Sequence, residues 1–135
     1  MAGIERITSG ENLIAIIIRR TFQPQSTEFV TTPDMNMQVG FIKYPAGGAV
    51  QPHVHLPIER TIQGTGEVLY MLSGKAELHL YDDARSLVAN RVMEAGDLLI
   101  LVSGGHGFEM AEDTLLLEVK QGPYTGLQEK ERFEP

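Results

Sequence analysis

Three of the four histidines, together with one glutamate, have the types and spacing of metal ligands. His53 and His55 are separated by one residue, so on a β-strand both imidazoles project from one face, with Cα atoms about 6.6 Å apart. Glu67 opens an apolar run, and His106 follows a turn that contains two glycines. Nitrogen and carboxylate ligands suit zinc, iron, nickel, manganese or copper better than calcium or magnesium. The sequence therefore predicts one divalent transition-metal ion bound by His53, His55, Glu67 and His106.

Three imidazoles and one carboxylate leave room for chemistry at the ion. Four protein ligands on a six-coordinate ion leave two positions for substrate, water or dioxygen, which distinguishes a reactive site from a closed structural one. The sequence has no cysteine, no Gly-x-Ser-x-Gly elbow, no Gly-Lys-Ser phosphate loop and no dinucleotide-binding glycine fingerprint. Any catalysis therefore rests on the metal, either as Lewis-acid isomerisation or lyase chemistry or as oxygenation, and the sequence does not choose between them.

A second glutamate competes for the role of carboxylate ligand. Glu59 lies four residues after His55, whereas Glu67 begins an apolar segment that runs into the turn at Gly74. The residues after Glu59 show no strand pattern, so we favour Glu67. The fourth histidine, His79, opposes an apolar face in an alternating segment, and we expect it on the surface.

The elements that must position these residues are short apolar runs separated by turns. No segment keeps the 3.6-residue apolar period of a helix, so the sequence predicts an all-β fold of around ten short strands, in a barrel or a two-sheet jelly roll. A hairpin is expected where two strands surround Gly74. The strands are expected at 13–18, 35–41, 50–55, 68–72, 76–81, 90–93, 98–102 and 115–119, with a further extended segment around 106–110.

The pattern around the ligands resembles the small cupins. Their first motif is Gly, five residues, His-x-His, three or four residues, Glu, six residues, Gly. This sequence fits it at Gly47, His53 and His55 and again at Glu67 and Gly74, but eleven residues, 56–66, separate His55 from Glu67. Glu59 satisfies the motif's spacing, with six residues between it and Gly66. Their second motif begins with a glycine, here Gly96, but Val102 replaces its proline, His106 comes one residue early and Met110 replaces its asparagine.

The cupin resemblance implies a single domain over residues 1–135, with a double-stranded β-helix, or jelly-roll barrel, as its core at about 35–120. An N-terminal strand at 11–20 and a C-terminal tail at 121–135 would complete it. The insertion is placed either to form a lip over the metal or to be a solvated surface loop.

Residues 118–124 are similar to the tail of small cupins whose genes often lie near surface-polysaccharide genes. That resemblance implies a role in carbohydrate metabolism and a sugar or sugar-nucleotide ligand. Arg60 is the candidate clamp for its phosphate or carboxylate, and Met71 and Phe108 are further candidates for the substrate pocket. A non-catalytic cupin module that holds a metal or a small ligand is the alternative to an enzyme.

Composition and charge limit the classes of partner that we expect this protein to bind. The formal net charge is -7 and the charges are scattered, so the basic surface that binds nucleic acid is missing. No apolar run is long enough to span a bilayer and no signal-peptide pattern opens the chain, so we expect a cytoplasmic protein. Because the strand at 13–18 is apolar on both faces, we expect it to pack at a homodimer interface.

Overall fold

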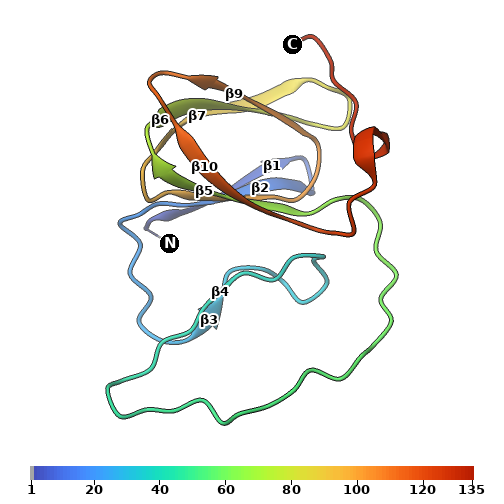
Figure 1. Cartoon of the computed structure of the whole chain (residues 1–135). Helices are drawn as coiled ribbons and strands as arrows, with labels where there is room; N and C mark the ends of the chain where they lie inside the picture. The colour runs from blue at the N-terminus through green and yellow to red at the C-terminus, as the bar shows by residue number, and fades with distance from the viewer. Residues whose placement is uncertain (1) are drawn as a thin grey trace. The chain divides into compact units, whose positions relative to one another are not determined.

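The computed structural model describes residues 2–135, except for the side chains of residues 127 and 128. The fold is all-β, as predicted, and the described residues include no α-helix (Figure 1). The strands are β1 (Ile4–Ser9), β2 (Asn12–Ile18), β3 (Glu28–Phe29), β4 (Gly40–Phe41), β5 (Glu67–Ser73), β6 (Lys75–Tyr81), β7 (Leu87–Glu94), β8 (Leu98–Leu101), β9 (Gly105–Met110) and β10 (Leu115–Lys120), followed by the 3-10 helix η1 (Gly126–Glu129).

The chain divides into two compact units. Residues 2–23 and Thr65–Pro135 form what we call the two-sheet unit, and Pro24–Gly64 form the loop unit. All strand pairs are antiparallel. The two-sheet unit contains a five-stranded sheet in the order β1-β2-β8-β5-β10 and a three-stranded sheet in the order β7-β6-β9. The loop unit contains the short pair β3-β4, and none of the three sheets closes into a barrel.

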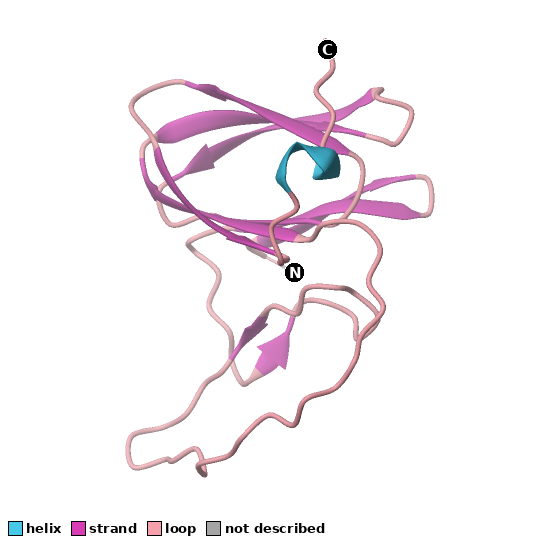
Figure 2. Cartoon of the chain, turned by 45° about the vertical axis from the view of Figure 1, so that its right-hand side comes forward, coloured by secondary structure: helices cyan, strands magenta, loops and turns pink. Residues whose placement is uncertain are grey.

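The core of the two-sheet unit lies between its two sheets, which Figures 1 and 2 show one above the other. Alternate residues of each strand point into this layer, as the period of two in a β-strand requires. Each large apolar side chain that leaves water here stabilises the fold by about 1.5–3 kcal/mol. The fully buried members include Ile14, Ile17, Met71, Leu78, Leu80, Met93 and Leu99.

The N-terminal strand has a different place from the one expected. β2 lies inside the five-stranded sheet between β1 and β8, and the residues from Ile14 to Ile18 are buried in the single chain. The reason for placing this strand at a dimer interface therefore does not hold, because β1 and β8 pair with its two edges. β1, which the sequence did not predict, pairs with β2 along its whole length.

The hairpin expected around Gly74 is also wrong. β5 and β6 are consecutive, but they belong to different sheets, so the chain crosses from one sheet to the other at this glycine. Gly74 has a positive φ of 96°, and an added Cβ would lie 2.3 Å from the carbonyl oxygen of Asp113. Only glycine fits such a bend, because both the backbone conformation and the close approach exclude a side chain.

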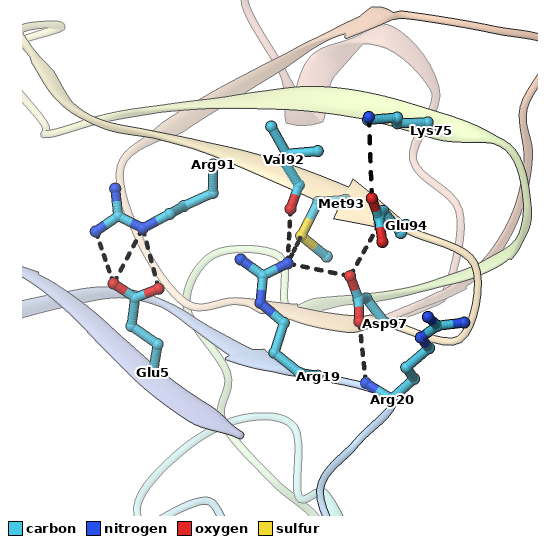
Figure 3. A network of polar contacts seen from close by, with 9 residues as sticks. All are labelled: Glu5, Arg19, Arg20, Lys75, Arg91, Val92, Met93, Glu94 and Asp97. Atoms are coloured by element: carbon cyan, nitrogen blue, oxygen red, sulfur yellow. Dashed lines mark hydrogen bonds and ion pairs between the residues drawn. The ribbon is translucent and has the colours of Figure 1, made fainter. Parts of the chain in front are cut away.

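A buried aspartate ties the end of β2 to the turn between β7 and β8 (Figure 3). Asp97 is 3% exposed. Its Oδ2 accepts hydrogen bonds from Arg19 Nη1 at 3.0 Å and from the backbone N–H of Glu94 at 2.9 Å, and its Oδ1 accepts one from the N–H of Arg20 at 3.0 Å. A buried carboxylate is tolerated when it is paired and hydrogen-bonded in this way. Asp97 thus has a structural role here.

Outside the two-sheet unit, the predicted strands are largely replaced by loops. Of the alternating segment 35–41 only Gly40–Phe41 is a strand, and the segment around His53 and His55 has no regular element. Within residues 2–135, no helix is long and apolar enough to cross a bilayer.

Candidate metal centre

Two of the four predicted ligands meet in the two-sheet unit. Glu67 opens β5 in the five-stranded sheet, and His106 lies on β9 in the three-stranded sheet. Glu67 Oε2 is 3.5 Å from His106 Nε2, and the two side chains are 18% and 35% exposed. The structure therefore brings together, from opposite sheets, a carboxylate and an imidazole that are distant in sequence.

Strand register aims both side chains into the space between the sheets. Glu67 shares a strand face with Leu69 and Met71, which belong to the core. His106 is the cross-strand partner of Leu80, another core residue, so it projects from the inner face of its sheet. The pair thus occupies one end of the layer whose middle is the apolar core.

The glycine turn before His106 is required by packing. Gly104 has a φ of 72°, and an added Cβ would lie 2.1 Å from the carbonyl oxygen of Tyr81. The next residue, Gly105, is the cross-strand partner of Tyr81. The turn therefore carries the chain close against β6 and fixes where β9 begins, one residue before His106.

The surroundings favour the neutral forms of both groups. Burial raises the pKa of the Glu67 carboxyl, and the neighbouring carboxylate of Glu118 raises it further, while the positive charges of Lys120 and Lys130 oppose the shift. Burial lowers the pKa of His106, an effect that Glu118 opposes and Lys130 reinforces. The lowered pKa of His106 favours the neutral imidazole, the form that binds a metal ion.

The other two predicted ligands lie together in the loop unit. The ring centroids of His53 and His55 are 5.2 Å apart, with an angle of 64° between the ring planes. His53 Nδ1 is 2.9 Å from the backbone carbonyl oxygen of Gln51, which leaves its Nε2 as the nitrogen available to a ligand. Both side chains are exposed. The expected proximity of the two imidazoles is present without the strand that was predicted to produce it.

The structure thus describes the predicted ligand set as two pairs, one in each unit. Among the described residues, no three His, Asp or Glu side chains form a group that could hold a metal ion. The four-ligand site therefore stays a prediction. Glu59, the rival carboxylate, is exposed in the loop unit, whereas Glu67 contacts a predicted histidine ligand.

The remaining candidates have varied surroundings. Met71 is buried in the core, and Phe108 is half-buried against it. Arg60 is exposed in the loop unit. His79, expected on the surface, lies on the outer face of β6 and is 18% exposed, with Nδ1 2.6 Å from Asn90 Oδ1.

Three charged residues near the Glu67–His106 pair were missed from the sequence. Glu118 and Lys120 lie on β10, on the strand face that Glu67 shares across the ladder, and Lys130 follows η1. Glu118 lies within hydrogen-bonding reach of Glu67. Alternation in the run Leu115–Lys120 could have placed Glu118 and Lys120 on one face, but only the pairing of β10 with β5 shows that this face is the one with Glu67.

Comparison of the chain with protein-family models, with curated proteins and with solved structures finds no match.

Proposed function

We propose that the protein is a metal-binding protein of the cupin type, in which His53, His55, Glu67 and His106 bind one divalent transition-metal ion. The observation that carries this proposal is the 3.5 Å approach of Glu67 to His106, two residues that the sequence predicted as ligands.

The arrangement of strands supports the jelly-roll part of the proposal. A jelly roll is built from two facing antiparallel sheets whose consecutive strands often lie in different sheets. The two-sheet unit has this property at β5–β6 and again at β8–β9 and β9–β10. β9, the strand that carries His106, is an edge strand of the three-stranded sheet. Among the described strands of the two-sheet unit, only β6 pairs with it.

The chain's own residues would bind and orient the ion. Glu67 supplies an oxygen ligand, and His106 supplies Nε2, the nitrogen that faces the carboxylate. The bound ion would supply Lewis-acid or redox chemistry at its open positions. A sugar or sugar nucleotide is the proposed ligand, with Arg60 as the group that holds its phosphate or carboxylate. We retain the homodimer as a proposal without an assigned interface.

Turnover separates a metal-dependent enzyme from a binding module. The metal-loaded protein is incubated with a panel of monosaccharides and nucleotide sugars, and products and thermal stability are followed together. Isomerised, cleaved or oxygenated product that disappears after chelation supports the enzyme. Stabilisation by one ligand without product supports the module. If neither occurs with any member of the panel, the proposed ligand class is wrong.

The pH dependence of metal affinity tests whether histidines are among the ligands. Ligation needs neutral imidazoles, so protons compete with the metal, and affinity should fall as pH drops through the ordinary histidine range near about 6.5. Because burial lowers the pKa of His106, this residue stays neutral to lower pH than a free histidine does. A metal titration by calorimetry at pH 8, 7 and 6 measures the effect, and affinity that is constant over this range contradicts histidine ligation.

A further inference from the structure

The five-stranded sheet has an exposed apolar surface on the side that faces away from the core. β5 and β10 are neighbours in this sheet, and Leu69 and Met71 of β5 point into the core. Because side chains alternate along a strand, the residues between them point outward, as do their cross-strand partners on β10. The exposed apolar residues of this outer β5–β10 face are 36–57% exposed: Tyr70, Leu72, Leu115, Leu117 and Val119.

The charged residues of these two strands all lie on the opposite side of the sheet. β5 and β10 contain three charged residues, Glu67, Glu118 and Lys120. Glu118 is the cross-strand partner of the core residue Leu69, and Lys120 is the partner of Glu67, which points between the two sheets. The outer β5–β10 face therefore carries no charged side chain from either strand, and another molecule can cover it without burying an unpaired charge.

The size of this face suits an interface between two copies of the chain. Half-exposed side chains of this size expose on the order of 100 Å² each, so the face exposes roughly 500 Å², toward the upper end of the about 300–600 Å² of the largest apolar patch on a typical monomer. Two such faces together contribute about 1,000 Å², which approaches the about 1,200–2,000 Å² of a specific interface once a polar rim is added.

The charge of the protein also favours this face as the place where two copies meet. The formal net charge is -7, so acidic surfaces of two copies repel each other at close approach. An uncharged face avoids that repulsion. A two-fold axis places the same patch on both sides of an interface, so each apolar side chain would meet apolar surface of the second copy.

We propose that two copies of the chain form a homodimer in which their outer β5–β10 faces pack against each other about a two-fold axis. Leu117 lies near the centre of the interface, because it is between Leu115 and Val119 on its strand and opposite Tyr70 on β5. This inference assigns an interface to the homodimer named under the proposed function, and it does not depend on whether the protein binds a metal.

Light scattering of metal-free protein over a range of concentrations tests this interface. Leu117→Lys introduces a charge at the centre of the outer β5–β10 face. Val92→Lys is the matched control, since Val92 is also an exposed apolar strand residue, 46% exposed, but lies on β7 in the three-stranded sheet. Circular dichroism shows whether each variant is folded.

We expect the wild type and Val92→Lys to be dimers of equal affinity. The dissociation constant of Leu117→Lys should be at least about 100-fold higher, because its dimer would bury two unpaired ammonium groups. A wild type that stays monomeric overturns both the homodimer and its interface. A folded Leu117→Lys variant with the dimer affinity of the wild type overturns the interface alone.

A second measurement does not depend on the folding of a lysine variant. The sequence has no cysteine, so Leu117→Cys and Val92→Cys each introduce a single thiol. The reaction of the thiol at position 117 with Ellman's reagent should slow as protein concentration rises and the dimer forms, whereas the thiol at position 92 should react at a constant rate. A rate at position 117 that is independent of concentration, in protein that light scattering shows to be dimeric, overturns the interface.

Discussion

The two pairs of candidate ligands differ in what holds them. Glu67 lies on β5, which pairs with β10 and β8, and His106 lies on β9, which pairs with β6. A buried apolar layer packs between the two sheets that contain these strands. His53 and His55 lie on a segment without regular structure, in a unit whose one strand pair, β3-β4, has two residues on each strand. The first pair is preorganised by long-range packing, and the second pair has no such support within its own unit.

The apolar residues of the two regions show the same contrast. In the two-sheet unit the inward side chains of β6 are fully buried, whereas Val54 and Leu56, which flank His55, are 82% and 76% exposed. Proline at positions 52 and 57 removes backbone donors from this segment, which disfavours an inner strand. The segment around His53 and His55 therefore lacks the organisation that β5 and β9 give to Glu67 and His106.

The largest expected effect is a loss of folding stability when the core of the two-sheet unit is disrupted. Leu80→Ala removes a fully buried side chain from β6 opposite His106 and should lower the free energy of unfolding by about 2–5 kcal/mol. The matched variant Leu56→Ala, in the loop unit, should change it by less than about 0.5 kcal/mol. Urea denaturation of both variants measures the difference. Similar losses would mean that the loop unit is packed as tightly as the core.

Two glycines, one in each unit, provide a second test of the difference in packing between the units. Gly74 and Gly47 both have positive φ, but an added Cβ meets the Asp113 carbonyl oxygen at Gly74 and nothing within 4 Å at Gly47. Backbone strain alone gives Gly47→Ala a cost of about 1–2 kcal/mol. Gly74→Ala should cost about 1–3 kcal/mol more, since neighbouring backbone must shift. Thermal unfolding of the two variants tests this, and equal costs would show that the sheet crossing is not rigid.

The smallest effect concerns charge at the centre. Lys130→Gln removes the ammonium group that acts on Glu67 and His106, so a divalent cation should bind about two- to fivefold more tightly. Lys75→Gln, which removes a lysine from the same unit that pairs with Glu94, is the control and should leave affinity unchanged. Calorimetric titration at low ionic strength gives both constants. Unchanged or weaker affinity in the Lys130 variant would contradict this electrostatic effect.

The sequence predicted the elements whose signals are local. β2, β8 and β10 follow from continuous apolar runs, and Glu67 and His106, which the structure brings together, were both predicted as ligands. The features that the sequence did not predict depend on pairing between distant segments of the chain. The turn at Gly74 has the composition of a hairpin, yet its strands pair elsewhere, and Glu118 and Lys130 join the centre only through the β5–β10 ladder and the returning tail. Alternation at 35–41 predicted a strand whose partner, β3, is only two residues long.

The most direct test asks whether the two pairs bind one ion. Wild-type protein is saturated with zinc, desalted and analysed for metal per chain, alongside His53→Ala, His106→Ala and, as the control, His79→Ala. We expect about one ion per chain in the wild type and in the control, and loss of most of the metal in both ligand variants, because each removes one of four donors to the same ion. Metal retained in either ligand variant at the wild-type level, or no metal in the wild type, would contradict a shared centre.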